Sequence, residues 1–125
     1  MTCDHGRHKE EFFSVDPITT DTAVVTVGEH LDFRNASDFN VILKDQVRQG
    51  TRKFILDFSD TKSIDSTGLG SIFTLYRQLK PLSGMICFAS ASDTVRITLK
   101  LTRSHKVFQQ FPTVEEAQKA VCTLG

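Results

Sequence analysis

Residues 53–70 read KFILDFSDTKSIDSTGLG, and this stretch sets the fold class. Its first six residues, 53–58, form a compact apolar run of strand length, which is typical of a strand buried on both faces. A polar connection follows over residues 59–66. An apolar stripe at helical spacing then predicts a helix from about Thr67 to Lys80. A buried strand followed by a helix is the repeating unit of an α/β protein.

The same alternation extends toward the N-terminus. Residues 22–27 (TAVVTV) are rich in β-branched side chains and predict a strand that ends at Gly28. A helix is then expected to run to about Gln49, with Asp32 or Asn35 as its cap, because the intervening apolar residues recur on one helical face.

Shorter elements complete the pattern. Residues 12–15 (FFSV) predict a short strand that Asp16-Pro17 breaks. Residues 85–89 (MICFA) predict a further buried strand. Thr113 and Glu116 have the spacing of a capping box, which opens the last helix.

One segment, residues 95–102, supports two interpretations. Its apolar and polar residues alternate, which favours a strand. Its Ser92-Asp93 start favours a helix, as does the crossover that neighbouring parallel strands require. The pattern alone leaves both open, and the predicted class is α/β with a small, partly parallel sheet.

The composition argues against two classes of function, nucleic-acid binding and membrane association. The chain has 125 residues, enough for one domain, and its 15 basic and 15 acidic residues give a formal net charge of zero. We therefore expect no direct nucleic-acid binding, because proteins that bind phosphate backbones are usually basic. No apolar run approaches the roughly 20 residues that span a bilayer, so no membrane association is expected.

The cysteines and the N-terminus point to a reducing compartment. The three cysteines, Cys3, Cys87 and Cys122, are odd in number and show no CxxC spacing. No metal site is expected from them, and Cys87 is predicted to be a small buried hydrophobe. Residues 1–10 are polar, lack an apolar signal core and are interpreted as a flexible tail before a domain at residues 11–125. A cytoplasmic location is the resulting expectation.

The stretch with the most chemical information is IDSTGLGS, residues 64–71. Two hydroxyl residues, Ser66 and Thr67, lie where a loop becomes a helix. Gly68 and Gly70 keep the first helical turn free of side chains, so another molecule can approach closely. The free amides and the dipole of a helix start favour an anion at this position.

Three interpretations compete for this stretch. The first is a helix cap, in which Asp65 or Ser66 bonds the free amides. The second is a catalytic site, but the stretch has no Gly-x-Ser-x-Gly nucleophile elbow and no lysine of a phosphate-binding loop. No catalytic residue and no cofactor are therefore assigned. The third is a phosphorylation site, with Ser66 exposed on the loop.

The chain resembles the bacterial anti-sigma factor antagonists, which are built on a STAS domain. The resemblance covers roughly residues 12–124. The segments that carry it are Gly28-Glu29 with Leu31-Asp32, Asn35-Ala36, residues 54–58, residues 64–70, and a late segment that starts at Val95-Arg96. The resemblance also favours a helix over residues 92–102. It implies a single STAS domain, with a mixed sheet of four or five strands and helices packed mainly on one face.

The resemblance also implies a function and a site. Ser66, with Thr67 as its rival, would be phosphorylated by an anti-sigma factor serine kinase. The unphosphorylated chain would bind that kinase and free a sigma factor, and a serine phosphatase would restore binding. ATP and metal would belong to the partners, and this chain would not be an enzyme. The partner-binding residues implied are Asp32, Asp65, Ser66, Thr67, Gly68, Leu69 and Gly70.

Two positions depart from the family pattern. His30 is an extra residue between Gly28 and Asp32, and we expect it to bulge the strand end there. Arg103 replaces the glycine that often follows the late helix, so that helix end is expected to differ. Two other functions stay open: a STAS scaffold or regulatory module in a cascade for secretion, motility or biofilm, and a nucleotide- or anion-binding domain.

Overall fold

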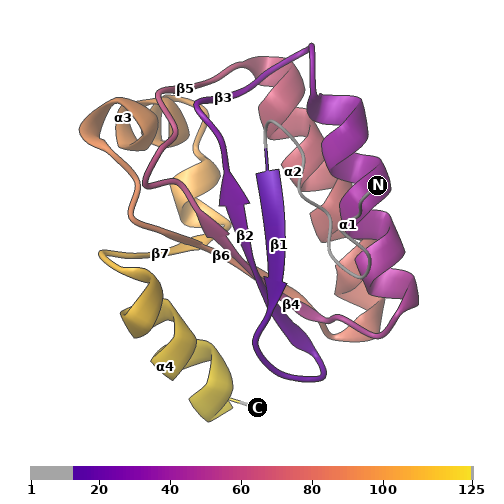
Figure 1. The fold of residues 1–125 in the computed structure, drawn as a ribbon. Helices are drawn as coiled ribbons and strands as arrows, with labels where there is room; N and C mark the ends of the chain where they lie inside the picture. Colours follow the sequence, from indigo (N-terminus) through magenta and orange to yellow (C-terminus); the bar gives the residue numbers. More distant parts are fainter. Residues whose placement is uncertain (1–12, 125) are drawn as a thin grey trace, which may run out of the picture.

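A five-stranded sheet forms the centre of the molecule (Figure 1). The computed structural model describes residues 13–124, with side chains up to Val121. The strand order is β1-β2-β4-β6-β7. β1 is antiparallel to β2, and every other neighbouring pair is parallel. The strands are β1 (Phe13–Pro17), β2 (Thr22–Val27), β4 (Lys53–Asp57), β6 (Met85–Ala89) and β7 (Gln109–Phe111). The predicted mixed sheet is confirmed.

Two further strands form a separate small ladder. β3 (His30–Leu31) and β5 (Ser63–Ile64) pair in parallel, with His30 opposite Ser63 and Leu31 opposite Ile64. His30 takes a regular place in this ladder, so the bulge expected there is absent from the described strands. The ladder brings the segment before α1 beside the segment before α2.

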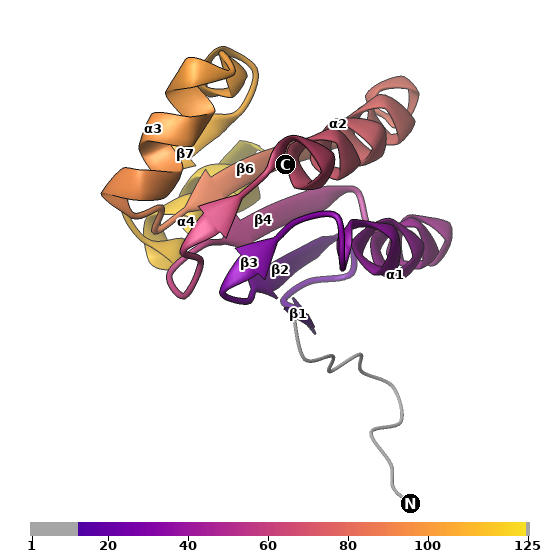
Figure 2. The same ribbon diagram turned by 90° about the horizontal axis from the view of Figure 1, so that it is seen from above.

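The helices cover the two faces of the sheet unequally (Figure 2). α1, α2 and α3 pack against one face, and α4 packs against the other. Each parallel strand is added on the same side of the previous one, so right-handed crossovers place their helices on one face. The bounds are α1 (Ala36–Arg48), α2 (Ser66–Leu79), α3 (Asp93–Leu101) and α4 (Val114–Leu124), with single 3₁₀ turns at η1 (Lys80–Leu82) and η2 (Ser104–Lys106).

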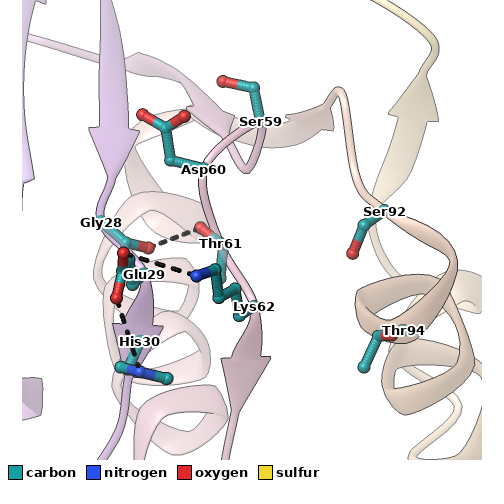
Figure 3. A pocket seen from close by; sticks show the side chains of 9 residues that line it. All are labelled: Gly28, Glu29, His30, Ser59, Asp60, Thr61, Lys62, Ser92 and Thr94. Atoms are coloured by element: carbon teal, nitrogen blue, oxygen red, sulfur yellow. Dashed lines mark hydrogen bonds and ion pairs between the residues drawn. The ribbon is translucent and has the colours of Figure 1, made fainter.

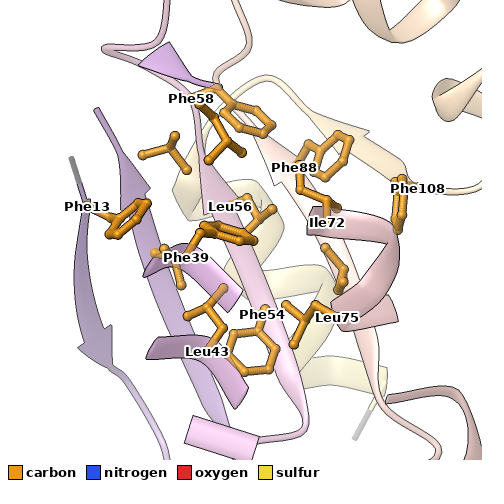
Figure 4. Close-up of a cluster of buried hydrophobic side chains, with 14 of the residues drawn as sticks. Phe13, Phe39, Leu43, Phe54, Leu56, Phe58, Ile72, Leu75, Phe88 and Phe108 are labelled. Atoms are coloured by element: carbon orange, nitrogen blue, oxygen red, sulfur yellow. The ribbon is translucent and has the colours of Figure 1, made fainter. Parts of the chain in front are cut away.

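The larger core lies between the sheet and the first three helices (Figure 4). Phenylalanines dominate it, and Phe58 and Phe88 pack edge to face with their ring centroids 5.1 Å apart. The smaller core, under α4, contains Ile55 and Cys87. The predictions that β4 is buried on both faces and that Cys87 is a buried hydrophobe are therefore confirmed. Burial raises the pKa of the Cys87 thiol to about 12.

Some element boundaries differ from the predicted ones. β1 continues through Pro17 instead of ending at Val15. Proline is tolerated there because β1 is an edge strand, where one side of the backbone needs no ladder hydrogen bond. The expected tail, residues 1–10, lies outside the described residues, as do Cys3 and the side chain of Cys122.

The ambiguous segment is a helix, α3. The Ser92 side chain caps it by accepting a hydrogen bond from the Val95 amide at 3.3 Å. The crossover between β6 and β7 outweighs the alternating pattern. The expectation that the end of this helix would differ is wrong, because Arg103 itself adopts the left-handed conformation, at φ 61°.

Candidate functional site

Ser66 is the first residue of α2, and its side chain is exposed. Asp65 caps the helix: its Oδ1 accepts a hydrogen bond from the Gly68 amide at 2.8 Å. The capping interpretation is thus confirmed for Asp65. Among the described residues, the Ser66 hydroxyl makes no hydrogen bond. The cap therefore does not engage the hydroxyl that phosphorylation would require.

The loop that follows β3 lies across the start of α2. The Asp65 amide donates to the Leu31 carbonyl at 3.2 Å, and the Phe33 amide donates to Asp65 Oδ2 at 3.2 Å. Asp65 thus serves two roles, as a helix cap and as a link to the neighbouring loop. Through these bonds the Asp32 and Asp65 segments, far apart in sequence, become one surface.

Asp32 forms an ion pair with Arg34 on the same loop. Arg34 Nη2 lies 2.7 Å from Asp32 Oδ2, and the Arg34 amide donates to Asp32 Oδ1 at 3.0 Å. The hydrogen bonds from the Arg34 side chain hold the pKa of Asp32 below its usual value. Asp32 in turn raises the pKa of Arg34, and the nearby Asp65 carboxylate adds to that effect.

Asn35 occupies the cap position of α1, but its side chain forms hydrogen bonds with the backbone of the preceding loop and strand instead. Its Oδ1 accepts from the Asp32 amide at 2.9 Å, and its Nδ2 donates to the His30 carbonyl at 2.8 Å. No hydrogen bond runs from this side chain to the described amides of α1. The buried Asn35 therefore fixes the shape of the loop beside Ser66.

The two glycines of α2 have different surroundings. A Cβ added to Gly68 would lie 2.1 Å from the Leu31 carbonyl oxygen, whereas one added to Gly70 would meet nothing within 4 Å. Gly68 and Leu69 are buried, and Gly70 is exposed. Gly68 therefore permits the close approach of α2 to β3. The close approach that glycine allows at this position is thus made by the backbone of β3, within the protein itself.

The exposed residues on the two segments that Asp65 links make up what we call the Ser66 surface: Phe33, Arg34, Ser66, Thr67 and Gly70. Phe33 is 73% exposed although it is aromatic. Thr67 and Gly70 also line a groove between α1 and α2. Sequence reasoning missed Phe33 and Arg34. An aromatic residue directly after Asp32 in an otherwise polar loop was the available signal.

A separate open hollow of about 850 Å³ lies at the carboxyl ends of β2 and β4 (Figure 3). Glu29 lies near two other side chains of its lining: Lys62 Nζ is 3.6 Å from Glu29 Oε2, and His30 Nε2 is 3.9 Å from Glu29 Oε1. His30 Nδ1 also lies 2.7 Å from Ser63 Oγ. The hollow offers a nucleotide no concentrated positive charge, so its groups do not favour the nucleotide-binding alternative.

No helix within residues 13–124 is long and apolar enough to cross a membrane. Within the same range, no three histidine, cysteine or acidic side chains converge as ligands for a metal ion.

Comparison with known proteins agrees with this geometry. The STAS domain model matches residues 15–117, so the chain belongs to the STAS domain family. A Thermotoga maritima protein provisionally named an anti-sigma factor antagonist is 28% identical over 105 residues, which are 83% of this chain and 93% of that protein. The resemblance predicted from the sequence is confirmed.

Solved structures show the same fold. The anti-sigma factor antagonist SpoIIAA in its unphosphorylated form matches with a TM-score of 0.80 and 22% identity, over 89% of this chain and 96% of that one. The phosphorylated form of SpoIIAA, from Bacillus, gives 0.71 and 22%, over 87% and 98%. A sulfate transporter family protein from Wolinella succinogenes gives 0.73 and 17%, over 88% and 90%.

Proposed function

We propose that this chain is an anti-sigma factor antagonist whose binding to an anti-sigma factor serine kinase is switched by phosphorylation of Ser66. The unphosphorylated chain binds the kinase and so releases a sigma factor. A serine phosphatase reverses the modification. The observation that carries the proposal is the exposed Ser66 hydroxyl, which the Asp65 cap leaves unengaged at the start of α2. The names of the Thermotoga maritima relative and of SpoIIAA support the same role.

The phosphorylated protein keeps its fold. A phosphoserine adds roughly −1.5 to −2 charge near neutral pH. At the first residue of α2 that charge meets the positive end of the helix dipole, which favours it. The Asp65 cap does not use the Ser66 hydroxyl, so modification removes no hydrogen bond from the cap. The switch therefore acts on partner binding and leaves folding intact.

Charge already surrounds the site. The Asp65 carboxylate precedes Ser66, and the Asp32–Arg34 pair lies on the loop that Asp65 holds. A partner that accepts this surface has to match its shape and charge when Ser66 is neutral. Two like charges 4 Å apart repel by about 4 kcal/mol at an effective dielectric constant of 20. Half of that energy would weaken binding more than tenfold.

Thr67 is the rival acceptor, since it is also exposed in the first turn. The preference for Ser66 rests on its place directly after the Asp65 cap and on the family motif it matches. Replacing each hydroxyl separately distinguishes the two.

The test is phosphorylation by the anti-sigma factor kinase of the same organism, followed by intact mass measurement and site mapping. The wild-type chain and Thr67→Ala should each gain one phosphate at residue 66, and Ser66→Ala should gain none while still binding the kinase. Phosphate at Thr67 in the Ser66→Ala protein, with regulation intact, would falsify the assignment.

The proposed role is regulatory binding in the cytoplasm, where sigma factors act, with ATP and metal supplied by the kinase and the phosphatase. Affinity capture with the unphosphorylated chain should retain a kinase that also binds a sigma factor. Retention of a kinase with no sigma partner would instead place the chain in another partner-switching cascade.

A further inference from the structure

The outer face of α3 and the turn after it expose three large apolar side chains. Ile97, Leu101 and Val107 are 58%, 80% and 44% exposed, whereas Val95 and Leu99 of the same helix are fully buried. Ile97 and Leu101 are four residues apart, so they form one stripe on the solvent side. Half of the six exposed large hydrophobic residues in the described part of the chain lie here. α3 therefore has two apolar stripes, and the sheet covers only one.

Basic residues frame this exposed stripe. The segment 93–106 contains one carboxylate and four cationic side chains, a formal charge of +3, although the whole chain is neutral. All four cations are exposed, and one of them, Arg96, pairs with Asp93. The four are Arg96, Lys100, Arg103 and Lys106. We call these cations, together with Ile97, Leu101 and Val107, the α3 patch.

A hollow of about 500 Å³ adjoins the patch, and its wall includes Arg96 and Lys100. Asp93, Ile97, His105 and Gln110 also line it. Among the described residues, the buried atoms His105 Nδ1 and Gln110 Oε1 have no hydrogen-bond partner. The recess beside the apolar stripe thus combines two cationic side chains, one of them paired with the Asp93 carboxylate, with polar groups whose hydrogen bonding is incomplete.

We infer that the α3 patch docks an acidic, amphipathic segment of the same partner that phosphorylation of Ser66 controls. The inference rests on the proposed function and adds a second contact to it. Positive charge selects an acidic segment, and the exposed stripe requires apolar side chains on one face of that segment. α3 packs beside β5, which ends two residues before Ser66 (Figure 1). One partner can therefore contact both places.

The test measures kinase affinity by calorimetry with single variants of the full chain. Leu101→Asp and Lys100→Glu should each weaken binding, at least tenfold for the central apolar residue. Leu82→Asp is the matched control. Leu82 is 44% exposed in η1, which follows the end of α2 that is distant from Ser66, so this variant should bind normally. Binding of the wild-type chain should also weaken as salt is raised from 50 to 500 mM.

The outcomes separate the two proposals. Normal affinity of Leu101→Asp and Lys100→Glu, with affinity still lowered by phosphorylation of Ser66, overturns the α3 inference alone. A wild-type chain that binds no kinase overturns both. The inference is also overturned if Leu101→Asp only disrupts a dimer in light scattering, or only abolishes binding to phosphatidylserine vesicles, while kinase affinity stays unchanged. Circular dichroism and thermal melting check that each variant is folded.

Discussion

Replacing Gly68 with alanine tests the contact that positions Ser66. The new Cβ would stand 2.1 Å from the Leu31 carbonyl oxygen and 2.7 Å from the Leu31 carbonyl carbon. Ordinary contact begins near 3.4 Å, so helix α2 and strand β3 must separate by about 1.3 Å at this point. Both neighbouring atoms belong to the backbone, so no side-chain rotation relieves the overlap.

The magnitude follows from two opposing effects. Alanine gains up to about 1 kcal/mol of helix propensity over glycine. Overpacking in a well-packed region costs about 1–3 kcal/mol or more, and the backbone overlap here places Gly68→Ala at the upper end. The expected net destabilisation is about 1–2 kcal/mol. Gly70→Ala meets no atom within 4 Å and should instead gain about 0.5–1 kcal/mol.

Urea unfolding of both variants is the assay, with the wild-type chain as reference. Gly68→Ala should unfold at a lower urea concentration, with a melting temperature several degrees lower, and Gly70→Ala at a higher one. If Gly68→Ala is as stable as Gly70→Ala, then the close approach of α2 to Leu31 does not hold and the geometry of the site is wrong.

Three other changes have defined outcomes. Asp65→Ala should lose about 0.5–2 kcal/mol in chemical denaturation, because its carboxylate bonds the Gly68 and Phe33 amides; an unchanged midpoint would contradict the capping role. Arg34 lowers the pKa of Asp32, so their ion pair stabilises the fold at pH values above the pKa that Asp32 has in the unfolded chain. This stabilisation is lost as the pH falls below about 4. Asp32→Asn should flatten the stability profile between pH 5 and 3, and an identical slope would refute this. With its pKa raised to about 12, Cys87 should resist iodoacetamide at pH 8 in the native protein and react after unfolding; equally fast labelling of the native protein would show that the thiol is accessible.

Much of the fold follows from local sequence patterns. The strand at 53–57 was predictable because it is a short continuous apolar run, and helix α2 was predictable because its apolar residues recur at the helical period. α3 was not predictable from periodicity, because its alternating apolar residues lie on two different faces of the helix. Val95 and Leu99 enter the core while Ile97 and Leu101 stay exposed. The Ser92 cap and the crossover between parallel strands decide in favour of a helix.

The candidate site was predictable in part, where its residues are neighbours in the sequence. Asp65 and Ser66 are adjacent in sequence, so their roles at a helix start follow from local chemistry. Phe33 and Arg34 reach that helix start only through the β3–β5 ladder and the bonds of Asp65. The contact between Gly68 and Leu31 likewise joins residues far apart in the chain, so no local pattern reveals it.

The most direct test of the switch compares the chain carrying phosphoserine at position 66 with the unmodified chain. Each is titrated into the anti-sigma factor kinase in a calorimeter, after matched thermal melts show both to be folded. We predict at least a tenfold loss of affinity on phosphorylation, with little change in melting temperature. Equal affinities for two folded proteins would contradict the proposal that charge at Ser66 controls partner binding.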